Sequence, residues 1–476
     1  MKHRPSVNIV GSGVNGLVAA ARLATSGWEV NLYERNMHPG GAAVSSTDIF
    51  PGNLVDMGAA AHPFGIASPA FNALGLDKNG LEWLMPPIQM AHPLEEEEAA
   101  LLSNSLDHTA VSLGRDFNRW KTLHSPIVEN IDEHLSNIWG PLSRFPKHPF
   151  RLTQFAPRAV LPATVLATSV FSTERARALF VGSSAHAVTS PRRPFTSAFG
   201  VLFNSLGMSK GWPVAQGGTQ SIVDALVHIV RLHGGYFHTG CVISSINELP
   251  FSDAIILNLT PRQVLNLKDI SLRDSVRRQL QNWKYGTACF KVDFLLKAPV
   301  PWSDPRVGQA GTVHVCGTAD EIAFAESEVE SGRLPDRPFV MVSQQYVADH
   351  SRGLTLWTYA HVPHGYIERF PGEVRQSIIR QIERFAPNFS HVIDSFHEAS
   401  PGDLEHWNPN LVGGDTAGGS MAGIQAFMRP RFTARPYRLG QRLYVASSST
   451  PPGAGVHGMS GWWAAGAILS AYSRNR

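Results

Sequence analysis

The sequence predicts an α/β protein, built from a Rossmann-like dinucleotide-binding domain and a second domain based on a sheet. The first observation is a glycine motif with the spacing G-x-G-x-x-G, formed by Gly11, Gly13 and Gly16. It lies between an apolar strand at residues 6–10 and an Ala-rich helix at residues 17–25, and a further strand at residues 29–33 ends at Glu34. In a dinucleotide-binding unit the glycines let the backbone approach the pyrophosphate, and the acid binds a ribose hydroxyl. A lone glycine motif is a weak signal, but the strand, the helix and the acid in this order make it specific.

The rest of the chain alternates between the two predicted domains. After a second glycine turn, Pro39-Gly40-Gly41, helical stretches broken by prolines fill residues 91–204. Apolar residues at helical spacing predict a helix over residues 221–232, and Gly217-Gly218 precedes it. The predicted strands that follow cover residues 236–246, 254–259, 287–296, 339–343, 355–361 and 443–446, and a last helix covers residues 462–472. We assign residues 1–90, 205–274 and 431–476 to the dinucleotide-binding domain, and residues 91–204 and 275–430 to a substrate-binding or cap domain.

Composition excludes several classes of function. With 476 residues the chain is long enough for two domains, and 43% hydrophobic residues indicate large cores, an apolar cavity or an apolar docking face. A net charge of +3 with scattered Lys and Arg argues against binding to nucleic acid. The cysteines, Cys241, Cys289 and Cys316, lie far apart, and no Cys/His cluster has metal-ligand spacing. Neither a redox-active dithiol nor a metal site is therefore predicted.

The sequence carries no targeting or membrane-spanning signal. The first strand begins by residue 6, which leaves no room for a signal peptide, and no apolar run approaches eighteen residues. We expect a cytoplasmic protein, while a peripheral contact with a membrane and the oligomeric state stay open.

The same glycine spacing occurs again at Gly453, Gly455 and Gly458, but in a different setting. No strand and no acid follow it, so it does not form a second nucleotide-binding unit. A glycine loop that opens onto a helix still offers unpaired N–H groups and the positive end of a helix dipole. Such a loop favours an anion or an electron-rich ring, and the alternative is a helix that packs closely through its glycines.

These features together resemble a known family. The first glycine motif with Glu34, the Pro39-Gly40-Gly41 turn, Gly217-Gly218 and the run from Pro451 to Met459 are similar to the FAD-dependent phytoene desaturase-related oxidoreductases. The resemblance is strongest to the branch with pyridine nucleotide-disulfide oxidoreductase domain-containing protein 2 and the desaturase-like carotenoid ketolases. It implies a glutathione reductase-type FAD-binding domain with an inserted mixed α+β substrate domain. It also implies one FAD, whose ADP half contacts Gly11, Gly13, Gly16, Glu34, Arg35, Gly41, Ala42 and Val242 and whose flavin end contacts Gly455, Val456 and Met459.

Two residues are candidates for catalysis. On the strand over residues 287–296, Lys291 shares a face with Cys289 and Asp293, and the stretch is similar to the strand of flavin amine oxidases whose lysine reaches the flavin through a water. Lys291 would hold that water or act as a base, and the alternative is that it lies on the wet side of a sheet. His457 lies inside the second glycine loop and would polarise a substrate or stabilise reduced flavin, and the alternative is a histidine bonded to the backbone.

Two further residues are candidates for the substrate pocket. Tyr359 and His361 alternate on a predicted strand and would line the cavity, although core packing is the alternative. His186, after a run of small residues, is interpreted as a helix-end or loop histidine rather than a base.

The resemblance implies an FAD-dependent oxidoreductase that transfers a hydride between a lipophilic small molecule and flavin N5, with oxygen or a quinone reoxidising the flavin. Amine oxidation is the enzymatic alternative, favoured by Lys291. A protein of this fold that binds a lipid or a protein partner without turnover is the alternative from another class. The ribose acid and the intact glycine loops argue against it. The sequence does not identify the substrate.

Overall fold

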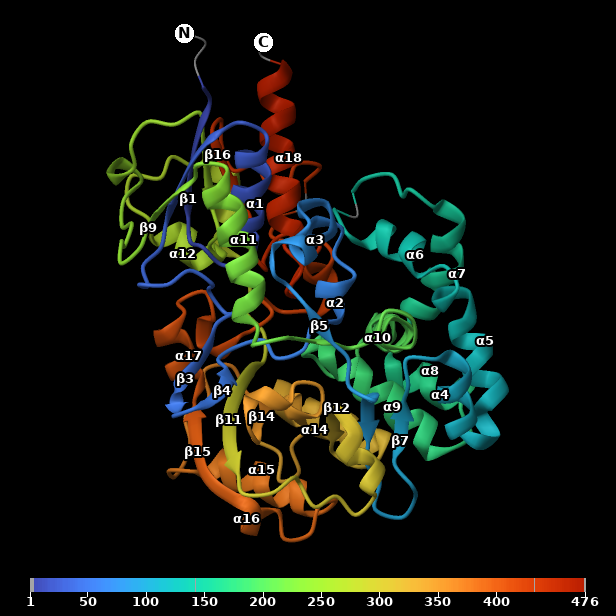
Figure 1. The fold of residues 1–476 in the computed structure, drawn as a ribbon. Helices are drawn as coiled ribbons and strands as arrows, with labels where there is room; N and C mark the ends of the chain where they lie inside the picture. The colour runs from blue at the N-terminus through green and yellow to red at the C-terminus, as the bar shows by residue number, and fades with distance from the viewer. Residues whose placement is uncertain (1–3, 142, 432, 475–476) are drawn as a thin grey trace.

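A computed structural model describes residues 4–141, 143–431 and 433–474. Its first domain is built on a five-stranded parallel sheet with the order β16-β10-β1-β2-β9. The strands are β1 (Ser6–Val10), β2 (Glu29–Tyr33), β9 (Tyr236–His238), β10 (Ala254–Leu257) and β16 (Leu443–Val445). Segments that lie far apart in the sequence therefore pair side by side in this domain (Figure 1).

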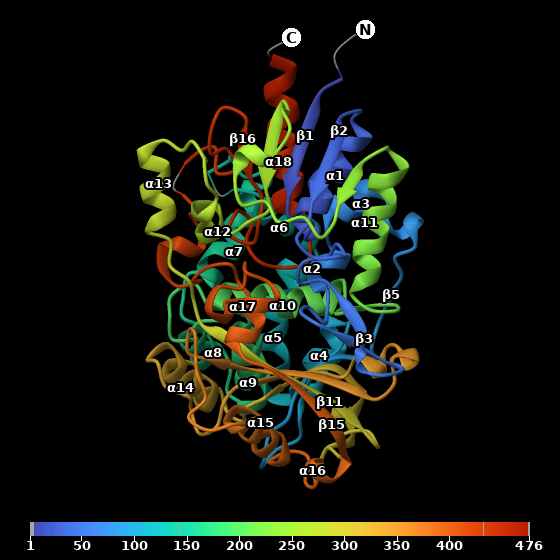
Figure 2. The ribbon, with the colours of Figure 1, turned by 90° about the vertical axis from the view of Figure 1, so that its left-hand side faces the viewer.

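Helices surround this sheet, and the first domain contains α1 (Val14–Thr25), α2 (Pro63–Ile66), α3 (Pro69–Leu74), α11 (Gln220–Leu232), α12 (Pro261–Asn266), α13 (Asp274–Gln281) and α18 (Met459–Arg474). Of these, α3 packs on α1 and α18 rather than on the sheet, and α2 contacts α10 (Ser197–Ser209) of the second domain. The contact between α1 and α18 is close because Gly461 has no side chain, and a Cβ there would lie 1.8 Å from the main-chain oxygen of Asn15. The two helices run beside each other at the same end of the molecule (Figures 1 and 2).

The second domain is built on a seven-stranded mixed sheet with the order β15-β11-β14-β13-β12-β6-β7. The strands are β6 (Ile88–His92), β7 (Ala100–Leu102), β11 (Ala288–Leu296), β12 (Ala310–Val315), β13 (Val340–Ser343), β14 (Thr355–Val362) and β15 (Ile393–Ala399). Phe290, Val292 and Phe294 on one face of β11 pack into an apolar core with α15 (Glu373–Glu383) and with Phe389 of α16 (Phe389–Val392). On the opposite face of the sheet, Lys291 of β11 and its partner Tyr359 of β14 form part of a cavity wall.

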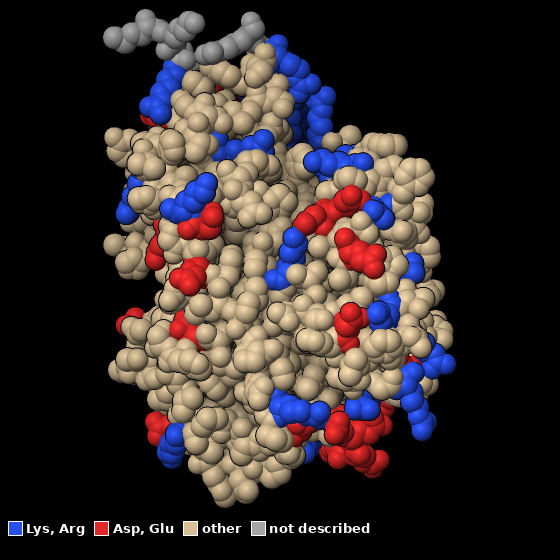
Figure 3. All heavy atoms as spheres, turned by 45° about the vertical axis from the view of Figure 1, so that its right-hand side comes forward, with Lys and Arg blue, Asp and Glu red and all other residues tan. Residues whose placement is uncertain are grey.

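A helical layer completes the second domain on the other side of that cavity. It consists of α4 (Leu106–Ser112), α5 (Phe117–Val128), α6 (Ile131–Ile138), α7 (Pro149–Ala159), α8 (Ala163–Val170), α9 (Glu174–Ser184) and α10 (Ser197–Ser209). The remaining elements are the hairpin of β3 (Ser45–Phe50) and β4 (Asn53–Asp56), the pair of β5 (Trp83–Leu84) and β8 (Val214–Ala215), α14 (Ala319–Glu330) and α17 (Pro401–Trp407). On the face in Figure 3, Lys and Arg side chains are spread among Asp and Glu and form no continuous basic surface.

A buried ion pair joins the two domains. Asp56, at the end of β4, and Arg352, before β14, lie 2.8 Å apart with both side chains fully buried. Burial alone would raise the pKa of Asp56, but Arg352 and hydrogen bonds that include the N–H of Thr219 hold this pKa below its usual value. Removing either partner would leave an uncompensated buried charge, so the pair fixes the domains against each other.

The predicted elements agree with the observed ones apart from their ends. The strands predicted at residues 6–10 and 29–33 are β1 and β2, and the two helices after glycine loops, α1 and α18, each begin three residues earlier than predicted. The strand predicted over residues 236–246 is too long, because β9 ends at His238 and Gly240 adopts a φ of 64°, which turns the chain. The second sheet begins at Ile88 in β6, within the segment 1–90 that the sequence assigned to the first domain.

Candidate active site

A cavity of about 900 Å³ runs between the two domains. At one end it meets the first glycine motif, and at the other it opens into a chamber between the second sheet and helices α6 and α10. The C-terminal glycine loop lies along the same cavity, so both glycine loops face one space. The structure thus brings together segments that the sequence presented as two separate motifs.

The start of α1 is arranged to hold an anion at one end of the cavity. Gly13 is the N-cap residue of α1, and no side chain caps the helix. The first N–H groups of the helix therefore keep their hydrogen-bonding capacity, and the helix dipole adds positive potential. Gly41 packs against this turn with a φ of 62°, and a Cβ on it would lie 2.9 Å from the Cα of Gly13. A pyrophosphate fits here, because the two glycine turns leave room for it and the N–H groups point toward it.

Glu34 is the acid predicted to hold a ribose, and it is nearly buried at the edge of the cavity. One carboxylate oxygen accepts hydrogen bonds from the N–H of Ser12 at 2.9 Å and from its hydroxyl at 2.8 Å, and the other accepts from the N–H of Asn36 at 3.0 Å. A carboxylate has about four acceptor positions, so one remains for a ligand hydroxyl. Glu34 therefore also fixes the shape of the glycine turn.

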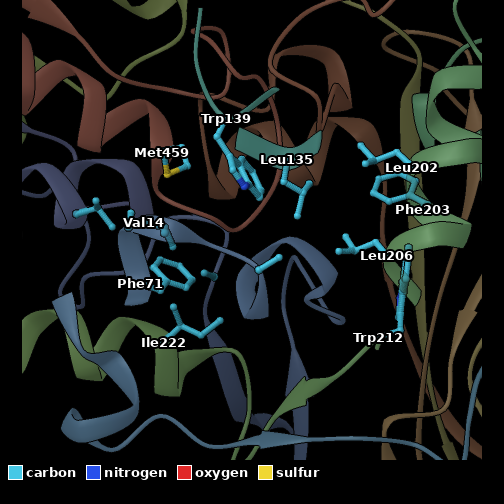
Figure 4. Packing of buried hydrophobic residues seen from close by; sticks show 14 of the residues in the cluster. Val14, Phe71, Leu135, Trp139, Leu202, Phe203, Leu206, Trp212, Ile222 and Met459 are labelled. Atoms are coloured by element: carbon cyan, nitrogen blue, oxygen red, sulfur yellow. The ribbon is translucent and has the colours of Figure 1, made fainter. Parts of the chain in front are cut away.

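Most of the residues expected to contact FAD line the cavity. They are Gly11, Gly13, Glu34, Arg35, Gly41, Ala42, Val242, Gly455 and Val456. Gly16 and Met459 do not line it. A Cβ on Gly16 would lie 2.3 Å from the main-chain oxygen of Gly11, which shows that this glycine serves close packing, and the side chain of Met459 packs into the core (Figure 4).

His457 lies in the cavity wall with its ring against Phe64 and Trp139. Its Nδ1 accepts a hydrogen bond from the N–H of Met459 at 3.0 Å. Burial lowers the pKa of His457 to about 4, although nearby backbone carbonyls favour the charged ring. The imidazole is therefore neutral near pH 7, and its contact with the backbone favours a role in shaping the loop over proton transfer.

Lys291 faces the cavity rather than the solvent. Its side chain is 7% exposed, lies 5.7 Å above the ring of Trp357, and forms an ion pair with Asp293. Burial lowers the pKa of the Lys291 ammonium, and the carboxylate of Asp293 opposes this shift. The alternative of an exposed sheet face is thus excluded, and a lysine with a lowered pKa lies where a substrate would bind.

Tyr359 and His361 differ in position. Tyr359 lines the cavity, with its ring perpendicular to that of Trp357 at 5.1 Å. His361 is outside the cavity wall: it is fully buried, its Nδ1 lies 2.8 Å from Glu326, and its ring stacks on Phe339. For His361 the structure favours the alternative of core packing, because the acid and the aromatic ring hold it behind the wall.

The chamber contains residues that sequence reasoning did not assign to a site. Its wall is mainly aromatic and aliphatic, and Figure 4 shows Leu135 and Trp139 of the α6 region lying across from Leu202 and Phe203 of α10. His186 also lines it, with its ring 5.1 Å from that of Phe203. No local pattern marks these residues as neighbours, since helix spacing predicts only that they are buried.

Comparisons with known proteins agree with this arrangement. Residues 9–74 match the family description "NAD(P)-binding Rossmann-like domain". The chain is 24% identical to pyridine nucleotide-disulfide oxidoreductase domain-containing protein 2 of Rattus norvegicus, over 95% of this chain and 91% of that protein. A variant of putrescine oxidase has a TM-score of 0.62 at 15% identity and covers 98% of this chain and 99% of its own. The chain has the fold of the FAD-dependent oxidoreductases. Cyclohexylamine oxidase from Brevibacterium oxydans has a TM-score of 0.60 at 15% identity, over 99% of this chain and all of that one.

The fold class expected from the sequence is therefore confirmed. FAD is the cofactor that this fold and this cavity accommodate, and the oxidoreductase class agrees with both. A desaturase-type reaction stays a prediction, since the two solved structures named above are amine oxidases. Within the described part of the chain, no helix has the length and hydrophobicity needed to cross a bilayer.

Proposed function

We propose that the protein is an FAD-dependent oxidoreductase that removes a hydride from an uncharged, lipophilic small molecule bound in the chamber. The charge of the cavity wall carries this proposal. Among the described residues that line the cavity, Glu34 is the only carboxylate, and it lies at the dinucleotide end. The chamber itself is lined mainly by aromatic and aliphatic side chains, which favour a substrate without charge.

The protein would supply binding and orientation. The start of α1 and Glu34 would hold the pyrophosphate and the ribose, and Gly455 and Val456 would lie beside the ring system. When bound, FAD supplies the acceptor for a hydride from a substrate carbon. Phe64 and Trp139 would exclude water from the reacting carbon, because their rings line the cavity beside His457 of the C-terminal glycine loop.

Lys291 would take up the proton that leaves the substrate. In the resting ion pair its Nζ is charged, so it must first give a proton to Asp293 or to water; burial, which lowers the pKa of Lys291, favours this neutral form more than water does. The neutral Nζ could then accept the proton from the substrate, and Asp293 would stabilise the ammonium that forms again. This division of work assigns binding to the apolar wall and proton transfer to one lysine.

Oxidation of an amine is the second candidate. The likeness in fold to putrescine oxidase and cyclohexylamine oxidase favours it, as does the position of Lys291 in the cavity wall. A protonated amine, however, would enter the chamber without a carboxylate to balance its charge. A neutral lipophilic substrate is therefore the better fit.

Anaerobic bleaching of the flavin tests both candidates. The purified protein should be yellow and should release FAD on denaturation. It is then mixed without air with polyenes, retinoids, sterols, fatty acyl compounds and amines, and the absorbance of oxidised flavin is followed. Bleaching by a neutral lipophilic compound supports the proposal, bleaching by amines alone favours the second candidate, and a colourless protein that FAD cannot reconstitute would refute both.

We also propose a peripheral contact with anionic membranes through the surface around α7. Phe145 and Phe150 are exposed there, and residues 140–173 contain Arg144, Lys147, Arg151 and Arg158 but no Asp or Glu. Arg151 is paired with Glu133 of α6 at 2.6 Å, so Arg144, Lys147 and Arg158 would have to supply the attraction to lipid phosphates. Aromatic side chains beside basic ones fit the interface of an anionic bilayer. The protein should therefore sediment with vesicles that contain phosphatidylglycerol, and F150S should reduce this. Equal sedimentation with vesicles of phosphatidylcholine alone would contradict the proposal.

A further inference from the structure

Two histidines meet at the end of the chamber that lies away from the C-terminal glycine loop. Nε2 of His186, in a short turn after α9, lies 3.0 Å from Nε2 of His314 on β12. Three successive ring contacts separate this pair from His457, through Phe64 and Phe203, with centroid distances of 6.0, 5.0 and 5.1 Å. The rings of Phe64 and Phe203 therefore lie between this pair and the loop that would face the flavin.

Both histidines are neutral near pH 7. Burial lowers the pKa of His186 to about 3, and burial together with two neighbouring histidines holds the pKa of His314 well below its usual value. A neutral imidazole has one N–H and one acceptor nitrogen, so a single proton lies between the two Nε2 atoms. The position of this proton decides whether Nδ1 of His186 is a hydrogen-bond donor or an acceptor.

The surroundings of His314 fix the position of that proton. Nδ1 of His314 is buried and has no hydrogen-bond partner in the described part of the chain, and it lies against Gly182. A buried N–H without an acceptor is rarer in proteins than a buried acceptor without a donor. The proton of His314 is therefore on Nε2, which donates to Nε2 of His186. The proton of His186 is then on Nδ1.

His186 thus presents an N–H donor to an apolar chamber. It lines the cavity between Phe203 and Trp212, and the described residues provide no partner for its Nδ1. Thr312, two residues from His314 on the same face of β12, also lines the cavity, and its hydroxyl has no partner among the described residues. Ser343, which pairs with Thr312 across β12 and β13, also lines the cavity, and its hydroxyl likewise has no partner among the described residues. A few polar groups in a mainly apolar wall are the usual means of orienting a ligand.

The charge of the wall limits the ligand to a neutral group. The basic residues among the described lining residues are Arg35, Lys268 and Lys291. Arg35 and Lys268 lie with the dinucleotide-binding segments, and Lys291 is paired with Asp293. A carboxylate beside His186 would have no counter-charge, whereas a carbonyl or hydroxyl oxygen needs only the N–H donor.

We propose that His186 binds a neutral carbonyl or hydroxyl oxygen of the substrate, that Thr312 is the second hydrogen-bonding group, and that His314 is a positioning residue. The inference rests on the proposed function, because it takes the chamber as the substrate site. It narrows the substrate to a lipophilic ketone or alcohol whose oxygen lies far from the carbon that loses the hydride.

Ligand binding to the FAD-loaded protein tests this inference. A terpenoid ketone, the matching alcohol and the parent hydrocarbon are titrated under anaerobic conditions, and binding is followed by quenching of tryptophan fluorescence, since Trp139 and Trp212 line the chamber. We expect the wild-type protein to bind the oxygenated compounds about tenfold or more tightly than the hydrocarbon. H186F should abolish this preference and leave hydrocarbon binding within about twofold.

Two variants serve as controls. H186Q keeps an N–H donor and should restore part of the preference, while a merely structural role would not distinguish Gln from Phe. T312V keeps the shape of the side chain but removes the hydroxyl, so it should reduce the preference for oxygenated ligands. It tests the site independently in case H186F fails to fold. FAD content and thermal unfolding are measured for each variant.

The outcomes separate the two proposals. Equal affinity of the wild type for ketone and hydrocarbon, or equal losses of both in H186F, would overturn the oxygen site even if the flavin is bleached. A preference for oxygenated ligands that depends on His186, without bleaching by any neutral compound, would support the oxygen site and refute the proposed reaction.

Discussion

Replacing Glu34 by Gln tests whether the N-terminal glycine motif holds a ribose. The carboxylate accepts three hydrogen bonds from Ser12 and Asn36, and one acceptor position remains for a ligand. An amide has one oxygen, so its NH₂ group must face either the N–H of Ser12 or the N–H of Asn36. E34Q therefore loses the negative charge in either orientation, and it also loses the acceptor left for the ligand when the NH₂ group faces Asn36.

The number of hydrogen bonds that E34Q loses sets the expected change in FAD affinity and in stability. A hydrogen bond to a charged group is worth about 1.5 to 3 kcal/mol, and about 1.4 kcal/mol corresponds to a tenfold change in affinity. Losing one such bond should raise the dissociation constant of FAD by about 10- to 150-fold. The lost bond within the protein should also lower the free energy of unfolding of the apoprotein by about 1 to 3 kcal/mol.

Titration of the apoprotein with FAD, followed by flavin fluorescence, measures the affinity, and urea unfolding measures the stability. S12A is the matched control. It removes one hydrogen bond to Glu34 but leaves the charge, so it should lower the stability by about 1 kcal/mol and change FAD affinity little. If E34Q binds FAD within twofold of the wild type, the assignment of a ribose to Glu34 is refuted.

Three further predictions concern packing, catalysis and pH. G461A should lower the free energy of unfolding by about 2 kcal/mol or more, because the added methyl group meets the main chain of α1. G466A on the same helix is the control and should be tolerated, because its methyl group meets only an arginine side chain. Thermal unfolding of the two variants tests this difference. K291M should keep its FAD and slow anaerobic bleaching by about 10²- to 10⁴-fold, and an unchanged rate would remove Lys291 from proton transfer. His62 and His457 have pKa values lowered to about 4, so they stay neutral in the folded protein while the unfolded chain binds protons below about pH 6.5. Above pH 6.5 these two histidines should therefore not affect the free energy of unfolding measured in urea. As the pH drops from 6.5 to 4, that free energy should fall by up to about 1.4 kcal/mol per pH unit for each histidine. A free energy of unfolding that is constant over this range would contradict their burial as neutral groups.

The fold and the dinucleotide end could be predicted because their signals are local. The glycine motif, the helix after it and Glu34 occupy one stretch of the chain, and the rules of the dinucleotide-binding unit relate their spacing to their positions. Alternation on residues 287–296 likewise predicted which side of β11 is apolar. The exception at residues 239–246 arose because one glycine, Gly240, turns a chain whose composition favours a strand.

The chamber could not be predicted because its residues come from distant segments. Trp139 and Phe203 both contact Phe64 only after α6 and α10 have packed, and His186 meets His314 across more than a hundred residues of sequence. For Lys291 the pattern gave the correct strand face, yet only the arrangement of the helical layer decides that this face is buried. Local patterns thus predict elements and motifs, while a cavity depends on how the layers are placed.

The order of strands in the parallel sheet has a consequence for biosynthesis. Its strand β1 pairs with β10, and β10 pairs in turn with β16, whose residues leave the ribosome hundreds of residues after β1. The same holds for α18, which packs on α1 where the nucleotide would bind. The early segment can pair β1 with β2 at once, but it lacks β10, β16 and α18 until those residues have been made, at a synthesis rate of roughly 5 to 20 residues per second. Cofactor loading is consequently a late event, and ribosome-stalled chains that end before β16 should not retain FAD.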